Sequence, residues 1–170
     1  MKKAKIYIET TVKGPSVKTG AYGVVLEFIA KSGKRFVRGR YGIEEDTTHH
    51  RSVLMAMILG LKRFDRGRCE IEIITGDKFI VNAIERGRPA DWNRQEWKNS
   101  KKQDVAHRDL WQQFLSEMDR HKITVTFSKI NVYSEKMLRE MNQKLKTYLK
   151  KRENLEKSEC EGDLQCIEMN

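Results

Sequence analysis

The stretch TTHHRSVLMAMILGLKRF, residues 47–64, decides the fold because the hydrophobic period of the chain changes there. Its apolar residues recur at i, i+3, i+4 and i+7, the spacing of one helix face, at Leu54, Met57, Ile58 and Leu61. We therefore expect a helix from about residue 48 to residue 64. What lies on either side of this helix determines which sheet it packs on.

Upstream of this helix, three segments are rich in β-branched and aromatic residues, as strands are. They are AKIYIE at 4–9, AYGVVLEFIAK at 21–31 and KRFVRGRY at 34–41. Ser32 and Gly33 supply a tight turn between the second and the third. Three consecutive strands with short connections predict an antiparallel meander.

Downstream, strands and helices alternate. Period and capping residues predict a strand at 69–75 (CEIEIIT), a short helix from its cap Asp77 to 85, a helix at 104–120, a strand at 123–128 and a helix at 134–150. Strands separated by helices pair in parallel. The sequence thus predicts an α/β fold with a mixed five-stranded sheet, three strands antiparallel and then two parallel, with helices on both faces.

Charge is unevenly distributed along the 170 residues. The formal net charge is +10 and the pI about 9.6, which favours a polyanionic partner, most commonly nucleic acid. Residues 151–170 carry three basic against six acidic residues, a net charge of −3, which leaves +13 on residues 1–150. We expect one domain over residues 1–150 and an acidic, disordered C-terminal tail over residues 151–170.

Two classes of protein are disfavoured by composition. No apolar run is long enough for a membrane span or a signal peptide, so we expect a cytoplasmic protein without a membrane partner. Cys69, Cys160 and Cys166 lack the CxxC pairs of a structural zinc site, and we expect reduced thiols.

Three stretches resemble the bacterial-type (type 1) ribonuclease H family. TGAYGVVLEF at 19–28 is similar to the start of the family's second strand, and TTHHRSVLMA at 47–56 resembles its TTNNRMELMA. WNRQEWKNSKKQDVAHRDLWQ at 92–112 is similar to the family's basic handle. The resemblance covers roughly residues 4–146 and implies a ribonuclease H-like fold.

The resemblance also implies a chemistry that this sequence does not support. Family members cut the RNA strand of an RNA–DNA hybrid with two magnesium ions held by four carboxylates. Those four positions fall on Glu9, Val53, Gly76 and Asn142, with Met141 as the alternative to Asn142. Valine and glycine offer no oxygen ligand to magnesium. We therefore expect a catalytically inactive homologue with no bound cofactor.

Other interpretations remain open at this point. A rearranged metal site could use Glu9 and Asp77, with His49 one turn before Val53 and the acidic residues at 44–46 nearby. That would give a divergent magnesium-dependent ribonuclease. A third possibility is a protein-interaction module that reuses the fold and makes contact through its acidic tail.

The candidate nucleic-acid contacts come partly from the resemblance and partly from charge. The resemblance implies minor-groove contacts by His49 and His50 and a contact by Lys78 at the start of the second helix. The segment 86–102, called the basic segment below, adds Arg86, Arg88, Arg94, Lys98, Lys101 and Lys102. We expect these cations to face phosphates, and Trp92 and Trp97 to anchor the segment to the body of the domain.

Overall fold

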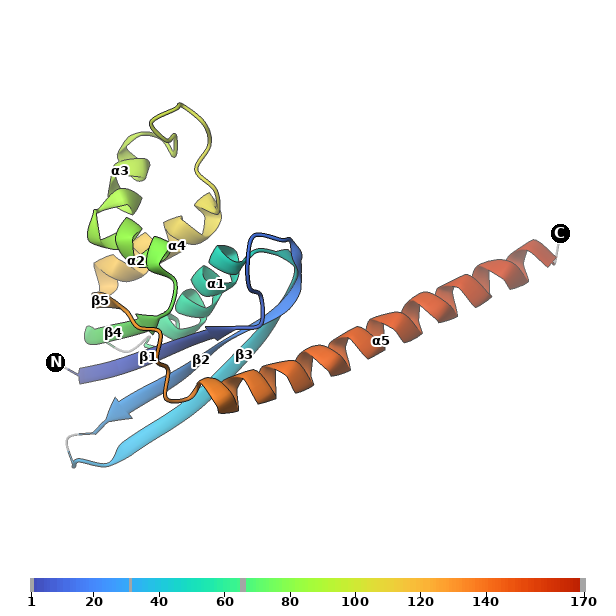
Figure 1. Ribbon diagram of the computed structural model, residues 1–170, viewed down its shortest axis with the longest axis horizontal. Coiled ribbons are helices and arrows are strands. Elements are labelled where there is room, and N and C mark those ends of the chain that lie inside the picture. The colour runs from blue at the N-terminus through green and yellow to red at the C-terminus, as the bar shows by residue number, and fades with distance from the viewer. Residues whose placement is uncertain (1, 31, 65–66, 169–170) are drawn as a thin grey trace.

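The computed structural model describes residues 2–30, 32–64 and 67–168, and side chains as far as Glu159 (Figure 1). Five strands form one sheet: β1 Lys2–Thr10, β2 Lys18–Ile29, β3 Arg35–Thr47, β4 Cys69–Thr75 and β5 Lys122–Phe127. Their order is β3-β2-β1-β4-β5. β2 pairs antiparallel with β1 and β3, whereas β4 pairs parallel with β1 and β5. The predicted fold class is confirmed.

The helices are α1 His49–Leu61, α2 Lys78–Glu85, α3 Arg88–Arg94, α4 Arg108–Arg120 and α5 Ser134–Glu168. Asp77 caps α2 as predicted, because its side chain accepts a hydrogen bond from the backbone N–H of Ile80. The start of α4 was predicted at residue 104, which is wrong. His107 adopts a left-handed backbone with φ of 60°, so regular helix begins only after it.

One face of the sheet carries the main hydrophobic core under α1, α2 and α4. Leu54, Met57 and Leu61 of α1 are completely buried there, which is the face that the sequence period predicted. Trp97 of the basic segment is only 3% exposed in the same core, and Trp92 packs edge-on against Trp111. The tryptophans therefore anchor the basic segment, as expected.

The other face is covered by α5, through the buried residues Met137 and Met141 (Figure 1). Close packing here depends on Gly23 of β2. A Cβ on Gly23 would lie 2.3 Å from Cδ1 of Tyr41 and 3.1 Å from Sδ of Met141. Helices thus lie on both faces of the sheet, as the sequence predicted.

The C-terminal part of α5 differs from expectation. The sequence predicted a helix end near residue 150, whereas the structure continues the helix to Glu168, where a disordered tail was expected. Arg152 forms a 2.5 Å ion pair with Glu45 of β3, and beyond it the helix extends away from the sheet (Figure 1). That residues 151–170 form a tail separate from the domain of residues 1–150 stays a prediction. Within the described residues, no helix is both long and apolar enough to cross a membrane.

Candidate functional site

A pocket of about 240 Å³ lies where β1 and β4 end, beside the start of α1. Parallel strands end at the same edge of a sheet, which is why residues far apart in sequence meet here. Three of the four predicted catalytic positions, Glu9, Val53 and Gly76, line this pocket. Its polar lining also includes Lys13, His49, Asp77, Lys129 and Asn131.

Glu9 is the carboxylate at the end of β1, and its oxygens are already occupied. Lys13 Nζ donates to Oε1 at 2.9 Å, Ser134 Oγ donates to Oε2 at 2.6 Å, and the Thr10 N–H also donates to Oε1. Burial of the carboxyl raises the pKa of Glu9, but the hydrogen bonds from Ser134 and Lys13 outweigh burial and lower that pKa below its ordinary value. Glu9 is therefore an anion neutralised by a lysine.

Val53 and Gly76 add no ligand to this pocket. Val53 is 2% exposed and belongs to the main hydrophobic core. Gly76, at the end of β4, is exposed, and a Cβ there would meet only the Ser128 carbonyl oxygen, at 3.5 Å. The valine packs as the sequence indicated, while Gly76 has space for a side chain that it lacks.

The fourth predicted position is not brought to the pocket. Asn142 is exposed on α5, and its alternative Met141 is completely buried against β2. Ser134, the first residue of α5, is the one that reaches Glu9. The resemblance assigned this position along the sequence alone, without placing the first turn of α5 relative to β1.

Magnesium requires hard oxygen ligands in near-octahedral geometry. Glu9 offers one carboxylate, which is bonded to Lys13, and the neighbouring positions hold an isopropyl group and a hydrogen atom. The residues at the family's ligand positions therefore do not fit a pair of magnesium ions.

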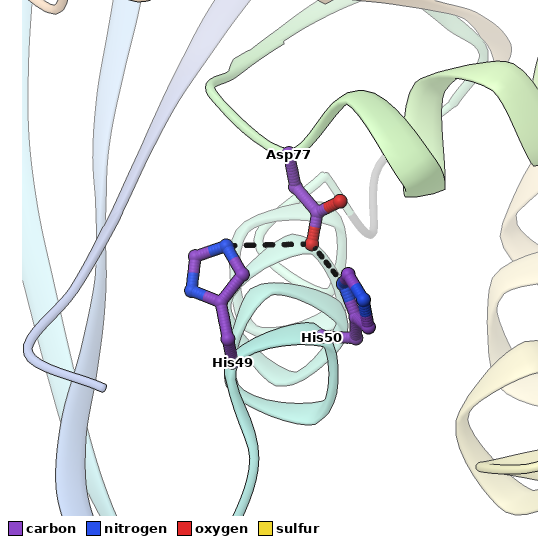
Figure 2. A group of neighbouring side chains, drawn as sticks. All are labelled: His49, His50 and Asp77. Carbon is purple, nitrogen blue, oxygen red and sulfur yellow. Dashed lines mark hydrogen bonds and ion pairs between the residues drawn. The ribbon is translucent and has the colours of Figure 1, made fainter. Parts of the chain in front are cut away.

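Asp77 forms a separate cluster with His49 and His50 (Figure 2). Its Oδ2 lies 2.5 Å from Nδ1 of His50 and 3.5 Å from Nε2 of His49. The hydrogen bond with Asp77 raises the pKa of His50 against the opposing effect of burial. Burial raises the pKa of Asp77, but the bonds from His50 and the Ile80 N–H lower it overall. The sequence suggested Asp77 and His49 for one rearranged metal site, but it did not indicate that His50 pairs with Asp77.

The predicted nucleic-acid contacts occupy two places. His49 and His50 begin α1, and Lys78 is exposed at the start of α2. Of these three, His49 lines the pocket. The basic segment includes α3, on the far side of the molecule from the end of α5 (Figure 1). Its six cations are all exposed: Arg86, Arg88, Arg94, Lys98, Lys101 and Lys102.

Two cations of the basic segment are partly neutralised. Arg94 pairs with Asp91, and Lys98 pairs with Asp104 at 2.5 Å. The other four cations, Arg86, Arg88, Lys101 and Lys102, form no ion pair with a carboxylate among the described residues.

The sheet order, with a long helix on one face and a pocket where β1 and β4 end, defines a ribonuclease H-like fold. Residues 2–153 match the family model of RNase H. The chain is 34% identical over 125 residues to a ribonuclease H of Syntrophomonas wolfei, covering 74% of this chain and 82% of the relative. It is 33% identical over 141 residues to a ribonuclease H of Caldicellulosiruptor saccharolyticus, covering 83% and 91%. This chain therefore belongs to the RNase H family.

Solved structures agree on the fold. LC9-RNase H1, a type 1 RNase H with the type 2 active-site motif, superposes with a TM-score of 0.64 at 20% identity, over 75% of this chain and 63% of that one. A foamy viral protease-reverse transcriptase in complex with RNA/DNA hybrid gives 0.58 at 13% identity, over 76% of this chain and 18% of that one. Both likenesses concern the fold alone.

Proposed function

We propose that this chain binds RNA–DNA hybrid or another A-like duplex and does not carry out magnesium-dependent cleavage. Membership of the RNase H family supports the substrate class, because curated relatives are ribonucleases H. The substrate strand would pass His49 and His50 at the start of α1 and Lys78 at the start of α2, and the basic segment would bind its phosphates.

One observation supports the proposed lack of magnesium-dependent cleavage. In the pocket where the family's carboxylates belong, Glu9 is bonded to Lys13 and Ser134, and Val53 is buried as a core residue. A lysine ammonium beside Glu9 repels a divalent cation, and no rotation of Val53 creates a ligand. Val53 therefore serves packing, and Glu9 serves charge balance.

A divergent magnesium-dependent ribonuclease is the second candidate, since Asp77 and Glu9 line the same pocket. Asp77, however, already accepts from the Ile80 N–H with Oδ1 and from His50 with Oδ2. Use of Asp77 as a magnesium ligand would cost the cap of α2 or the bond to His50. We therefore rank this candidate second.

The test measures binding and cleavage on the same purified sample, with a short labelled RNA–DNA hybrid over a range of salt concentrations. If about five phosphates are neutralised, the slope of log K against log salt should be about −4 by counterion release. Changing Arg94, Lys98, Lys101 and Lys102 together to alanine should flatten this slope by several units. No cleavage product should form in magnesium or in manganese.

The matched control removes the same charge from α5, by changing Lys136, Lys146, Lys150 and Lys151 to alanine, all of which are exposed. This variant should keep most of the wild-type slope. Equal slopes for the two variants would exclude the basic segment as the contact surface. Cleavage in magnesium that is lost in Asp77→Asn would favour the second candidate, and salt-independent or absent binding would favour a protein-interaction module.

A further inference from the structure

We propose that His49, His50 and Asp77 form a binding site for a first-row divalent transition-metal ion such as Zn²⁺. This site is distinct from the magnesium positions of the family and does not depend on the proposed function. Two imidazole nitrogens and one carboxylate oxygen come together, each within 4.8 Å of the others, at the junction of α1 and α2. Imidazole and carboxylate are typical zinc ligands, and three of them leave one position open.

The orientation of His49 is the first support. Its Nδ1 lies 2.8 Å from the carbonyl oxygen of Val12, and a carbonyl can only accept, so Nδ1 carries a proton. In the neutral imidazole, Nε2 then carries a lone pair, and Nε2 points at Asp77 Oδ2 (Figure 2). A bond from one ring nitrogen to a backbone carbonyl is the arrangement that orients metal-binding histidines.

The separation of the two ligand atoms is the second support. His49 Nε2 and Asp77 Oδ2 lie 3.5 Å apart. A tetrahedral ion with bonds of about 2.0 Å separates its ligand atoms by about 3.3 Å, close to this distance.

Asp77 is held in the manner of a monodentate ligand. Its Oδ1 accepts from the Ile80 N–H at 3.1 Å, which leaves Oδ2 for the cluster. The Asp77 side chain is 1% exposed, so its charge needs a nearby cation. His50 Nδ1 lies 2.5 Å from Oδ2 and must move outward by somewhat under 1 Å to admit an ion. The His50 side chain is 44% exposed, which leaves room for this movement.

The open fourth position would face the pocket, which His49 and Asp77 line together with Glu9. Water or a phosphate oxygen could occupy it. Two of the three ligand atoms are imidazole nitrogens, so we expect a site selective for an ion with nitrogen affinity rather than for magnesium.

The experiment uses the full-length chain without a polyhistidine tag, with Cys160→Ser and Cys166→Ser to remove two competing thiols. Titration calorimetry with Zn²⁺ should show one saturable site that millimolar Mg²⁺ does not displace. Loss of an outer-shell partner alone weakens metal sites about 10- to 100-fold, so His49→Asn or Asp77→Asn should weaken binding about 100-fold or more. Asparagine keeps the capping oxygen at residue 77 and so preserves α2.

The matched control is His107→Asn, the same substitution outside the cluster, at a left-handed position that asparagine tolerates. It should bind Zn²⁺ as the wild type does. Imidazole nitrogen resonances give a readout without mutation: Zn²⁺ should shift those of His49 and His50 and leave that of His121 unchanged. The proposal would be overturned if Zn²⁺ showed no saturable binding. It would also be overturned if all variants bound Zn²⁺ equally and the His49 and His50 resonances did not shift.

Discussion

Val53 and Gly76 line one pocket, yet a carboxylate would meet different surroundings at each. Val53 is 2% exposed among the side chains of the main core. A Cβ on Gly76 has ordinary contact distance to the Ser128 carbonyl oxygen, and the position is exposed. One position can therefore accept a charged side chain without repacking, and the other cannot.

We accordingly predict that Val53→Glu lowers the free energy of unfolding by about 3 kcal/mol, because a buried carboxyl without partners is costly. Gly76→Asp should change it by less than about 0.5 kcal/mol, as exposed substitutions do. Urea unfolding at neutral pH measures both. The control is Val53→Ala, which removes packing without adding charge. If Val53→Glu is no less stable than Val53→Ala, the glutamate side chain can reach solvent.

Among the elements, Arg51 connects β3, α1 and α4. Its Nε donates to Glu44 Oε1 at 2.8 Å, and its two terminal nitrogens donate to the two oxygens of Asp109, each at 3.1 Å. This forked pairing fixes the first turn of α1, where His49 and His50 lie. The sequence pattern does not indicate this link, because Arg51 and Asp109 are separated by 58 residues.

This link predicts a pH dependence of stability. The hydrogen bonds from Arg51 lower the pKa of Asp109. Ionised Asp109 therefore stabilises the folded state fully above the unfolded-state pKa near 3.9. This stabilisation is lost as pH falls through the lower folded-state pKa. Since the Asp109 side chain is 57% exposed, we expect only about 0.5 to 1 kcal/mol.

Asp109→Asn should thus be less stable than wild type at pH 7 by that amount, and the difference should vanish in strong acid, as measured by urea unfolding across pH. Asp119→Asn, an exposed change on the same helix, is the control and should show no such difference. A stability gap for Asp109→Asn that persists unchanged in acid would contradict the ionic origin.

At the scale of the whole molecule, positive and negative charge lie at separate ends. The basic segment is on one side, and the end of α5 extends away on the other (Figure 1). Residues 153–170 carry one lysine against six acidic residues. The side chains of residues 151–159 are exposed, and the ion pair between Arg152 and Glu45 is the last described contact of α5 with the sheet.

Deletion of residues 153–170 should therefore change the free energy of unfolding by less than about 0.5 kcal/mol, because it removes no described core contact. It should also tighten hybrid binding at low salt, since it removes net negative charge from the molecule, and the gain should fade as salt screens it. In the full chain, changing Glu153, Glu156 and Glu159 together to glutamine should reproduce part of this gain in binding. Weaker binding after the deletion would place the tail in the binding surface.

The sequence by itself determined the order of the five strands and of α1, α2, α4 and α5, and the residue types at the positions that the resemblance assigns to carboxylates. Apolar period and capping depend on neighbours a few residues apart, so β4 at Cys69–Thr75 and the cap Asp77 could be located without tertiary information. The absence of carboxylates at residues 53 and 76 followed from residue identity once the resemblance had aligned them.

Only the tertiary structure decided which side chains meet. The resemblance suggested Asn142, and the way in which α5 approaches β1 brings Ser134 to Glu9. The cluster of His49, His50 and Asp77 joins residues across a separation of 27 positions, where two helices begin at the edge of one sheet. Such convergence depends on the relative placement of whole elements, which local periodicity does not encode.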